Sequence, residues 1–322
     1  MTKLPVTAAS ATTVALDGRE VLAFAGCNYL GLSFHPAVHA ALGAGLARYG
    51  LSTSASRETT GNTAAHDRLE RDVVIHLGTA DAVVVPDGYT ANLALAEALA
   101  RGPWRCGAAV IDRRSHRSLR AAIEVAGLRT IEYAHRDADA ALAAVRAAQA
   151  EAPGRGVAIF TDGVFTSDGA LAPLAELLSG LPARGATLVV DDCHGFCTIG
   201  RGGRGALSHL GLPSDDPRVA VTTTLAKGLG CHGGAIAGSQ ELCAAVRRFG
   251  NAYVGTTPVS PAIACAASAA LLGEGVLAPL IEYPGGPAAC YFRLSVSSEH
   301  TPEQIDTVLA ALGSRVRQPC AA

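Results

Sequence analysis

The sequence predicts an α/β fold built on a mostly parallel sheet of seven strands with helices on both faces. The chain has 322 residues, of which 49% are hydrophobic and 17% charged, enough for one large domain with a smaller one appended. From residue 64 to residue 161, short apolar runs alternate with longer segments of helical periodicity. This alternation is typical of strands joined by crossover helices, which makes neighbouring strands parallel.

The first part of the chain predicts an extended arm followed by one helix. Apolar runs at 14–16 and 21–24 flank a turn at Asp17-Gly18, which indicates a hairpin. Residues Pro36–Tyr49 have apolar side chains at helical spacing, with proline at the start and glycine beyond the end. The loop from Gly50 to Arg57 contains small residues throughout; it is either a flexible connector or a place where the backbone approaches a ligand or another subunit.

The sheet strands and their covering helices then follow in order. The candidate strands are 82–85, 108–112, 128–133, 157–161, 186–190, 219–223 and 234–238, with 128–133 as a potential outlier. The expected helices are 64–77, 90–100, 118–126 and 138–152, and a last helix that opens at Thr301 with a capping box and runs through Leu312.

Two polar sites follow buried strands of this sheet. Asp191, Asp192 and His194 come directly after one apolar run, and Lys227 follows the next in a setting of Thr, Ala and Gly. Only one other lysine, Lys3, occurs in the chain, so Lys227 is a candidate amine nucleophile. The plainer alternative is that the aspartates cap a helix or turn and the lysine is an ordinary surface residue.

Pyridoxal phosphate chemistry would use both sites together. A lysine amine forms a Schiff base with the aldehyde of this cofactor, and a carboxylate opposite the pyridine nitrogen keeps that nitrogen protonated. Lys227 fits the first role and Asp191 fits the second.

The two sites also resemble those of a known family. Asp191-Asp192-Cys193-His194-Gly195 followed by Thr224-Leu225-Ala226-Lys227-Gly228 is similar to the Asp-Glu-Ala-His and Thr-x-Ser/Gly-Lys motifs of the α-oxoamine synthases. These are pyridoxal phosphate enzymes of fold type I that join an amino acid to an acyl thioester with loss of carbon dioxide. The resemblance covers roughly residues 24 to 261 and includes Asn28-Tyr29-Leu30-Gly31-Leu32, Ser56-Arg57, His66, Gly88-Tyr89-Thr90-Ala91-Asn92, Asp112, His116, Ser118 and Asp168-Gly169.

The resemblance implies roles for two histidines and a threonine beside the cofactor ring. His116 would lie against the pyridine ring, and His194 would reach the phenolic oxygen of the ring or the substrate carbonyl. Thr166, in the segment that matches Ser-Met-Asp-Gly, would supply a hydroxyl near the ring oxygen. Without the family, His116 is a solvated residue at a helix start and His194 a satisfied core histidine.

The phosphate end of the cofactor is expected at a strand-to-helix turn. There the amides of Gly88 and Tyr89 and the helix dipole favour an anion, and the Thr224 hydroxyl would be a further donor. Family members complete this cradle with a hydroxyl of the neighbouring subunit, for which Thr256 or Thr257 is the match. The resemblance therefore implies a homodimer with shared active sites.

The C-terminal part departs from the family. A second domain of roughly a hundred residues is usual there, whereas here Gly273-Glu274-Gly275 leads almost at once to Glu282 and then to the closing signature from Phe292 to Thr301. An internal deletion is the economical explanation. We expect an N-terminal arm and first helix over 1–45, a large cofactor-binding domain over 46–260 and a reduced small domain over 261–322.

Four residues are expected to bind substrate. Arg293 survives the deletion and matches the arginine that grips the substrate carboxylate in the family, a task for which a planar bidentate donor is well shaped. Asn28, Ser56 and Arg57 are the other candidates from the resemblance.

Composition limits the other classes of partner. The formal net charge is −2 without a basic run, which argues against nucleic acid and anionic membrane surfaces. Nine cysteines without paired spacing, and no secretory leader, favour the cytoplasm. Cys193 and Cys197 flank His194, but no second Cys/His cluster completes a metal site, and no weakly polar stretch is long enough to span a bilayer.

The sequence thus predicts a pyridoxal phosphate enzyme that condenses a small amino acid with an acyl thioester, carried by coenzyme A or by a carrier protein, to give an α-aminoketone. Two other interpretations remain open. Another fold type I activity, such as an aminotransferase, aldolase or lyase, would use the same Asp191 and Lys227. A non-catalytic partner subunit is suggested by the shortened C-terminus and opposed by Lys227, and an NAD-binding module is disfavoured because no Gly-x-Gly-x-x-Gly follows the first strand.

Overall fold

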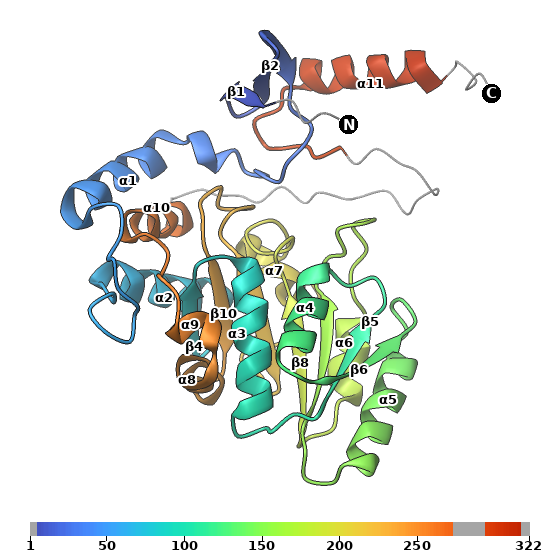
Figure 1. Cartoon of the computed structure of the whole chain (residues 1–322). Coiled ribbons are helices and arrows are strands. Elements are labelled where there is room, and N and C mark those ends of the chain that lie inside the picture. The colour runs from blue at the N-terminus through green and yellow to red at the C-terminus, as the bar shows by residue number, and fades with distance from the viewer. Residues whose placement is uncertain (1–4, 273–293, 317–322) are drawn as a thin grey trace.

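The computed structural model describes residues 5–272 and 294–316, arranged around a seven-stranded sheet (Figure 1). The strand order is β4-β10-β9-β8-β7-β5-β6. The strands are β4 (Asp81–Val85), β5 (Ala108–Asp112), β6 (Arg129–Tyr133), β7 (Val157–Asp162), β8 (Ala186–Asp191), β9 (Val219–Thr224) and β10 (Gly234–Gly238).

Six strands of this sheet point the same way, and β10 is antiparallel to both of its neighbours, β4 and β9. The mostly parallel seven-stranded sheet expected from the sequence is therefore confirmed. The run 128–133, treated above as a potential outlier, contributes the edge strand β6.

Helices cover both faces of the sheet, and the alternation of side chains along each strand explains why. On β4, Ala82 and Val84 face one hydrophobic cluster, whereas Val83 and Val85 face the other. One cluster packs under α2 (Ala64–Leu77), α5 (Ala138–Glu151), α6 (Leu174–Gly180) and α10 (Pro261–Leu272). The other packs under α3 (Gly88–Arg101), α4 (Arg117–Val125) and α8 (Gln240–Phe249).

The predicted helices form close to their expected ends because their capping signals are local. Both α1 (Pro36–Tyr49) and α2 begin and end at the predicted residues, and α2 opens with a capping box between Thr63 and His66. The last helix, α11 (Pro302–Val316), runs past its predicted end at Leu312. Five further helices were not predicted from the sequence: α6, α7 (Gly205–His209), α8, α9 (Asn251–Val254) and α10.

The N-terminal arm packs against the C-terminal segment. It forms a three-stranded sheet of β1 (Val6–Ala9), β2 (Thr13–Leu16) and β3 (Arg19–Leu22), of which the sequence predicted only the second hairpin. The main-chain N–H of Ser295 donates to the carbonyl of Phe24 at 2.8 Å, and the Phe24 ring stacks on His300 at 4.2 Å between centroids. Figure 1 shows β1 and β2 beside α11, so the two ends of the described chain form one layer above the sheet domain.

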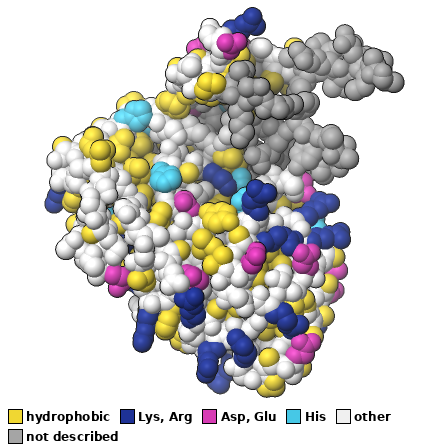
Figure 2. Space-filling model, in the orientation of Figure 1, with side chains coloured by type: hydrophobic (Ala, Val, Ile, Leu, Met, Phe, Trp, Pro, Cys, Tyr) yellow, Lys and Arg dark blue, Asp and Glu magenta, His cyan; other side chains and the backbone are white. Residues whose placement is uncertain are grey.

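The outer surface mixes charges of both signs. On the face seen in Figure 2, basic and acidic side chains are interspersed over the sheet and its helices. Within residues 5–272 and 294–316, every helix falls short of the length or apolar character that a bilayer crossing requires.

A buried ion pair fixes the small-residue loop to the core. The guanidinium of Arg57 contacts the Glu70 carboxylate on α2, and each of these residues is only 9% exposed. Glu70 Oε1 also accepts the main-chain N–H of Val84 at 2.9 Å, and Arg247 lies 3.6 Å from Glu70 Oε2. Glu70 thus joins a loop, a helix, a strand and α8 at one point.

We predict that Glu70→Ala lowers the free energy of unfolding by about 3–5 kcal/mol, because it removes the buried carboxylate that the Arg57 guanidinium contacts. The matched control is Glu151→Ala, which breaks an ion pair with Arg129 whose side chains are 61% and 53% exposed; it should cost less than about 1 kcal/mol. Denaturant unfolding of both variants measures the difference. Equal losses would contradict the prediction.

Candidate functional site

The carboxyl ends of the parallel strands meet along one edge of the sheet. In the strand register, Asp162 at the end of β7 pairs with Asp191 at the end of β8, and Asp191 pairs with Thr222 on β9. Crevices at this edge are where open α/β sheets bind ligands. A cavity of about 300 Å³ lies there.

Most of the residues predicted to bind a cofactor line this cavity. Its lining consists of Asp87, Gly88, Tyr89, His116, Ser118, Asp162, Thr166, Asp191, Cys193, His194, Thr224 and Lys227. These residues come from the ends of β7, β8 and β9 and from the N-termini of α3 and α4. Residues far apart in the sequence therefore form one site.

Lys227 lies at one end of a short line of hydrogen-bonding groups. Its Nζ is 2.7 Å from His194 Nε2, and His194 Nδ1 is 2.7 Å from the hydroxyl of Tyr29. The imidazole can therefore pass a proton between the amine and the phenol. Tyr29 belongs to the motif Asn28-Tyr29-Leu30-Gly31-Leu32, and no role was predicted for it from the sequence.

Asp191 sits at the floor of the cavity and is 4% exposed. Its Oδ2 accepts from the amide nitrogen of Asn92 at 2.7 Å, and its Oδ1 accepts the main-chain N–H of Cys193 at 3.1 Å. Burial raises the pKa of the Cys193 thiol well above its ordinary value. The thiol beside Asp191 is therefore protonated at neutral pH.

A second carboxyl, Asp162, lies beside Asp191, and the sequence analysis missed it. Asp162 Oδ2 accepts the main-chain N–H of His116 at 2.9 Å. Burial, and next the charge of Asp191, raise the pKa of Asp162 to about 7. The available signal was its position at the end of a predicted strand, the same position that drew attention to Asp191.

Asp192 does not line the cavity but shapes the turn below it. It is 2% exposed, and its Oδ2 accepts the main-chain N–H of Ala206 at 2.9 Å. A Cβ on Gly205 would lie 1.8 Å from this oxygen, so glycine is required there. Burial raises the pKa of Asp192 to about 8, which makes it a neutral acid beside the charged Asp191.

The opposite wall of the cavity is the N-terminus of α3. Asp87 caps this helix by accepting the N–H of Thr90 at 2.7 Å, and the geometry of a first turn leaves the amides of Gly88 and Tyr89 without intrahelical acceptors. A Cβ on Gly88 would come within 3.0 Å of Cys193 Sγ and of Thr224 Cβ. Small size at this position keeps the backbone close to the cavity, as an anion cradle needs.

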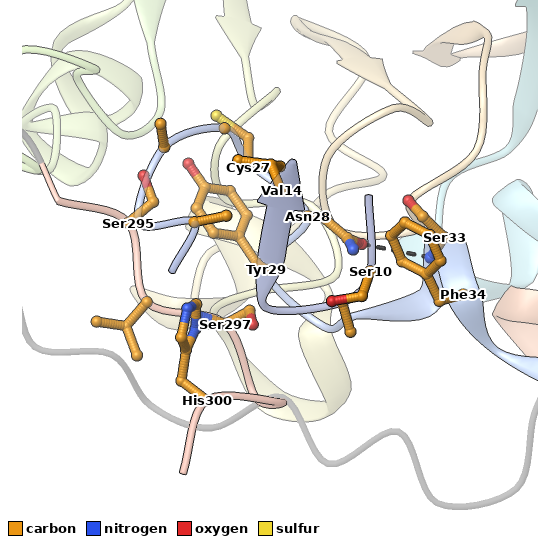
Figure 3. Close-up of a pocket in the computed structure, with 15 residues that line it drawn as sticks. Ser10, Val14, Cys27, Asn28, Tyr29, Ser33, Phe34, Ser295, Ser297 and His300 are labelled. Atoms are coloured by element: carbon orange, nitrogen blue, oxygen red, sulfur yellow. Dashed lines mark hydrogen bonds between the residues drawn. The ribbon is translucent and has the colours of Figure 1, made fainter. Parts of the chain in front are cut away.

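Three predicted substrate residues that the structure describes, Asn28, Ser56 and Arg57, do not line this cavity. Asn28 lines a second cavity of about 250 Å³, between the arm and the segment 295–300. Figure 3 shows Asn28 and Tyr29 in this cavity with Ser297 and His300. Because Tyr29 also bonds His194, the two cavities share a wall.

The remaining predicted residues are placed elsewhere. Arg57 is buried against Glu70, and Ser56 is next to it in the same loop. The Thr256 hydroxyl donates to the Ala252 carbonyl at 2.8 Å, and neither Thr256 nor Thr257 lines the cavity of its own chain. Arg293 lies outside the described residues.

Comparisons with known proteins find one family model and several similar synthases. Residues 19–278 match the family described as Aminotransferase class I and II. The chain is 40% identical over 253 residues to the 8-amino-7-oxononanoate synthase of Pseudomonas aeruginosa, an alignment that covers 79% of this chain and 61% of that protein. It is 32% identical over 355 residues to a putative 8-amino-7-oxononanoate synthase of Desulfovibrio desulfuricans, which covers 93% of this chain and 90% of the relative.

Solved structures agree on the fold. A serine palmitoyltransferase of Sphingomonas wittichii matches with a TM-score of 0.72 at 26% identity, over 81% of this chain and 64% of that one. Another from S. paucimobilis matches with a TM-score of 0.83 at 22% identity, over 98% and 93%.

The chain is short for its relatives. It spans about three fifths, 61%, of the length of the Pseudomonas protein. The aligned length of 355 residues with the Desulfovibrio protein exceeds the 322 residues of this chain. That relative therefore carries residues that this chain lacks.

The neutral Asp192 predicts a pH dependence of stability. Since folding raises its pKa from the ordinary value to about 8, the folded state holds a proton that the unfolded state has lost. This contribution to stability is complete at acid pH and declines as the pH rises from about 4 to about 8. Asp192→Asn should flatten that decline in plots of unfolding free energy against pH; an unchanged slope would contradict the assignment.

Proposed function

This chain belongs to the aminotransferase class I and II family and, within it, to the α-oxoamine synthases, and on that premise we propose that it condenses a small amino acid with an acyl thioester using pyridoxal phosphate. A carbon–carbon bond would form between the α-carbon and the acyl carbonyl, the thiol would leave, and the α-carboxylate would be lost as carbon dioxide. The observation that carries the proposal is the convergence of Lys227 and Asp191, an amine and a carboxylate, on one cavity.

The residues present fit pyridoxal phosphate. The amine of Lys227 suits the aldehyde, Asp191 suits a protonated pyridine nitrogen, and the first turn of α3 with Thr224 suits the phosphate. Thr166 supplies a hydroxyl to the same cavity, and His116 lines it near Asp191. When bound, the cofactor supplies an aldehyde that joins amines and a ring that accepts the electrons released at the α-carbon.

Lys227 and His194 are the groups of this chain that move protons. With Nζ at 2.7 Å from His194 Nε2, the amine can give up a proton to the imidazole and then take the α-proton of the amino acid. The Tyr29 oxygen can accept the hydrogen bond from Nδ1–H of the imidazolium that this transfer creates. From the buried floor of the site, Asp191 would stabilise a proton on the pyridine nitrogen.

The substrates are assigned by position and by resemblance. The second cavity, which contains Asn28 and adjoins the site at Tyr29, would receive part of the acyl donor. Arg293 would bind the carboxylate of the amino acid, and Ser56 and Arg57 would support binding from the loop before α2. A homodimer in which Thr256 or Thr257 serves the neighbouring site, and a cytoplasmic location, stay predictions.

A transamination, aldol or lyase reaction would use the same lysine and aspartate, so products decide between them. We expect the protein loaded with pyridoxal phosphate to release carbon dioxide and free thiol when it receives a small amino acid and an acyl thioester. Formation of a keto acid instead would establish transamination. A protein that takes up no cofactor would favour the non-catalytic partner subunit.

We predict that Lys227→Ala abolishes covalent trapping of pyridoxal phosphate by borohydride and lowers turnover by several orders of magnitude, because the attacking amine is gone. The chain has only one other lysine, Lys3, so Lys3→Ala is the matched control and should trap the cofactor as the wild type does. Mass spectrometry of the reduced protein reads the result. Trapping that persists in Lys227→Ala would overturn the proposed function.

A further inference from the structure

A line of buried side chains connects the two groups that face the cofactor ring in the proposed function. His116 Nδ1 is 2.7 Å from Ser118 Oγ, Ser118 Oγ is 2.9 Å from Asn92 Nδ2, and Asn92 Nδ2 is 2.7 Å from Asp191 Oδ2. Thr222 closes the line from the sheet, with its hydroxyl 2.6 Å from Asn92 Oδ1. The three connecting residues are at most 2% exposed. A buried network of this kind fixes one arrangement of its side chains only if every donor meets an acceptor.

The direction of each hydrogen bond follows from Asn92. A carboxylate accepts and does not donate, so the side of the Asn92 amide that faces Asp191 must be the NH₂ group. Its carbonyl oxygen then accepts from the Thr222 hydroxyl, and its second N–H donates to Ser118 Oγ. No other orientation of the amide satisfies all three contacts.

The hydrogen bond from Asn92 also determines how Ser118 bonds to His116. Because its oxygen already accepts from Asn92, its hydroxyl hydrogen is available to His116 Nδ1. The main-chain N–H of Ser118, which can only donate, also points at Nδ1 from 3.3 Å, since His116 is the N-cap of α4. Two donors on Nδ1 leave the imidazole proton on Nε2.

We propose that Asn92 and Ser118 are positioning residues that hold Asp191 and His116 as one hydrogen-bonded unit, with His116 kept as the neutral imidazole protonated at Nε2. The meaning of this unit for catalysis rests on the proposed function, whereas the state of the imidazole does not. The Nε2–H then stands on the side of the ring away from α4 as a fixed donor.

The charged groups around His116 fit a neutral ring. Partial burial is the main cause that lowers its pKa, and the charges of Lys227 and Arg117 act in the same direction. The carboxylate of Asp191 opposes them, and Asp162 accepts the main-chain N–H of His116 rather than the ring. The hydrogen bonds to Nδ1 add to this balance, because they stabilise only the form that can accept.

Nitrogen-15 NMR of the full chain labelled at histidine tests the unit without cofactor. The chain has 10 histidines, and a His116→Gln spectrum identifies the signal of interest by its loss. We expect the wild type at neutral pH to show His116 protonated at Nε2 alone. In Ser118→Ala we expect a higher pKa for His116 and partial population of the form protonated at Nδ1.

The matched control is Ser268→Ala, which removes an equally buried hydroxyl, 2% exposed, on α10. Its His116 signal should titrate as in the wild type. A wild-type ring protonated at Nδ1, or at both nitrogens, at neutral pH overturns the proposal even if Ser118→Ala does not fold. A folded Ser118→Ala whose His116 titrates unchanged overturns it as well.

Asn92→Asp tests the other half of the unit. It keeps the shape of the side chain but sets a carboxylate oxygen against Asp191, so the affinity for pyridoxal phosphate should fall about ten- to hundredfold. Asn251→Asp is the matched control. Asn251, on α9, donates to Glu97 at 3.0 Å and does not line the cavity. The affinity of this variant for pyridoxal phosphate should equal that of the wild type. Equal affinities in the wild type and both variants contradict the role of Asn92. A wild type that takes up no cofactor contradicts the proposed function, and the NMR result then decides the state of His116 by itself.

Discussion

The parallel pairing of β7, β8 and β9 is the constraint on which the site depends. It sets Asp162 beside Asp191 and Asp191 beside Thr222, so acidic groups crowd one buried edge of the sheet. Adjacent carboxylates in a buried place repel each other, which raises the free energy of charging them together. Asp191 receives two N–H donors, while burial raises the pKa values of Asp162 and Asp192. The sheet thus sets the Asp191 carboxylate where a pyridine nitrogen would need it.

This arrangement also explains the polar residues behind the cavity. Asn92 on α3 and Ser118 on α4 come from helices on the same face of the sheet, and they reach the strand ends through their side chains. Hydrogen bonds in such a buried place are worth more than in water, and a missing partner costs correspondingly more. Packing of α3 against α4 is therefore directly coupled to the orientation of the groups that line the cavity.

Much of the fold could be predicted from the sequence because its signals are local. The ends of α1 and α2 are marked by a proline, a capping threonine and two following glycines, and all seven sheet strands are short apolar runs. Features that depend on contacts distant in sequence were missed. Asp162 becomes part of the site only because β7 neighbours β8, and the burial of Arg57 depends on Glu70 and on a strand beneath it. The short helix α7 depends on Asp192, which accepts from Ala206 across the turn.

The contacts between the arm and the segment after residue 294 have a consequence for how such a chain can evolve. They use main-chain groups, as from Ser295 to Phe24 and from Ser298 to Tyr29, together with one ring stack and a side-chain hydrogen bond from Gln304 to Thr12. Main-chain hydrogen bonds tolerate most replacements of the side chains that flank them. The segment is therefore anchored on the arm itself, at Phe24 and Tyr29, and none of these contacts involves the residues that connect it to α10. A gene could lose or gain codons between α10 and residue 294 and still encode a C-terminal segment that binds the arm in the same way.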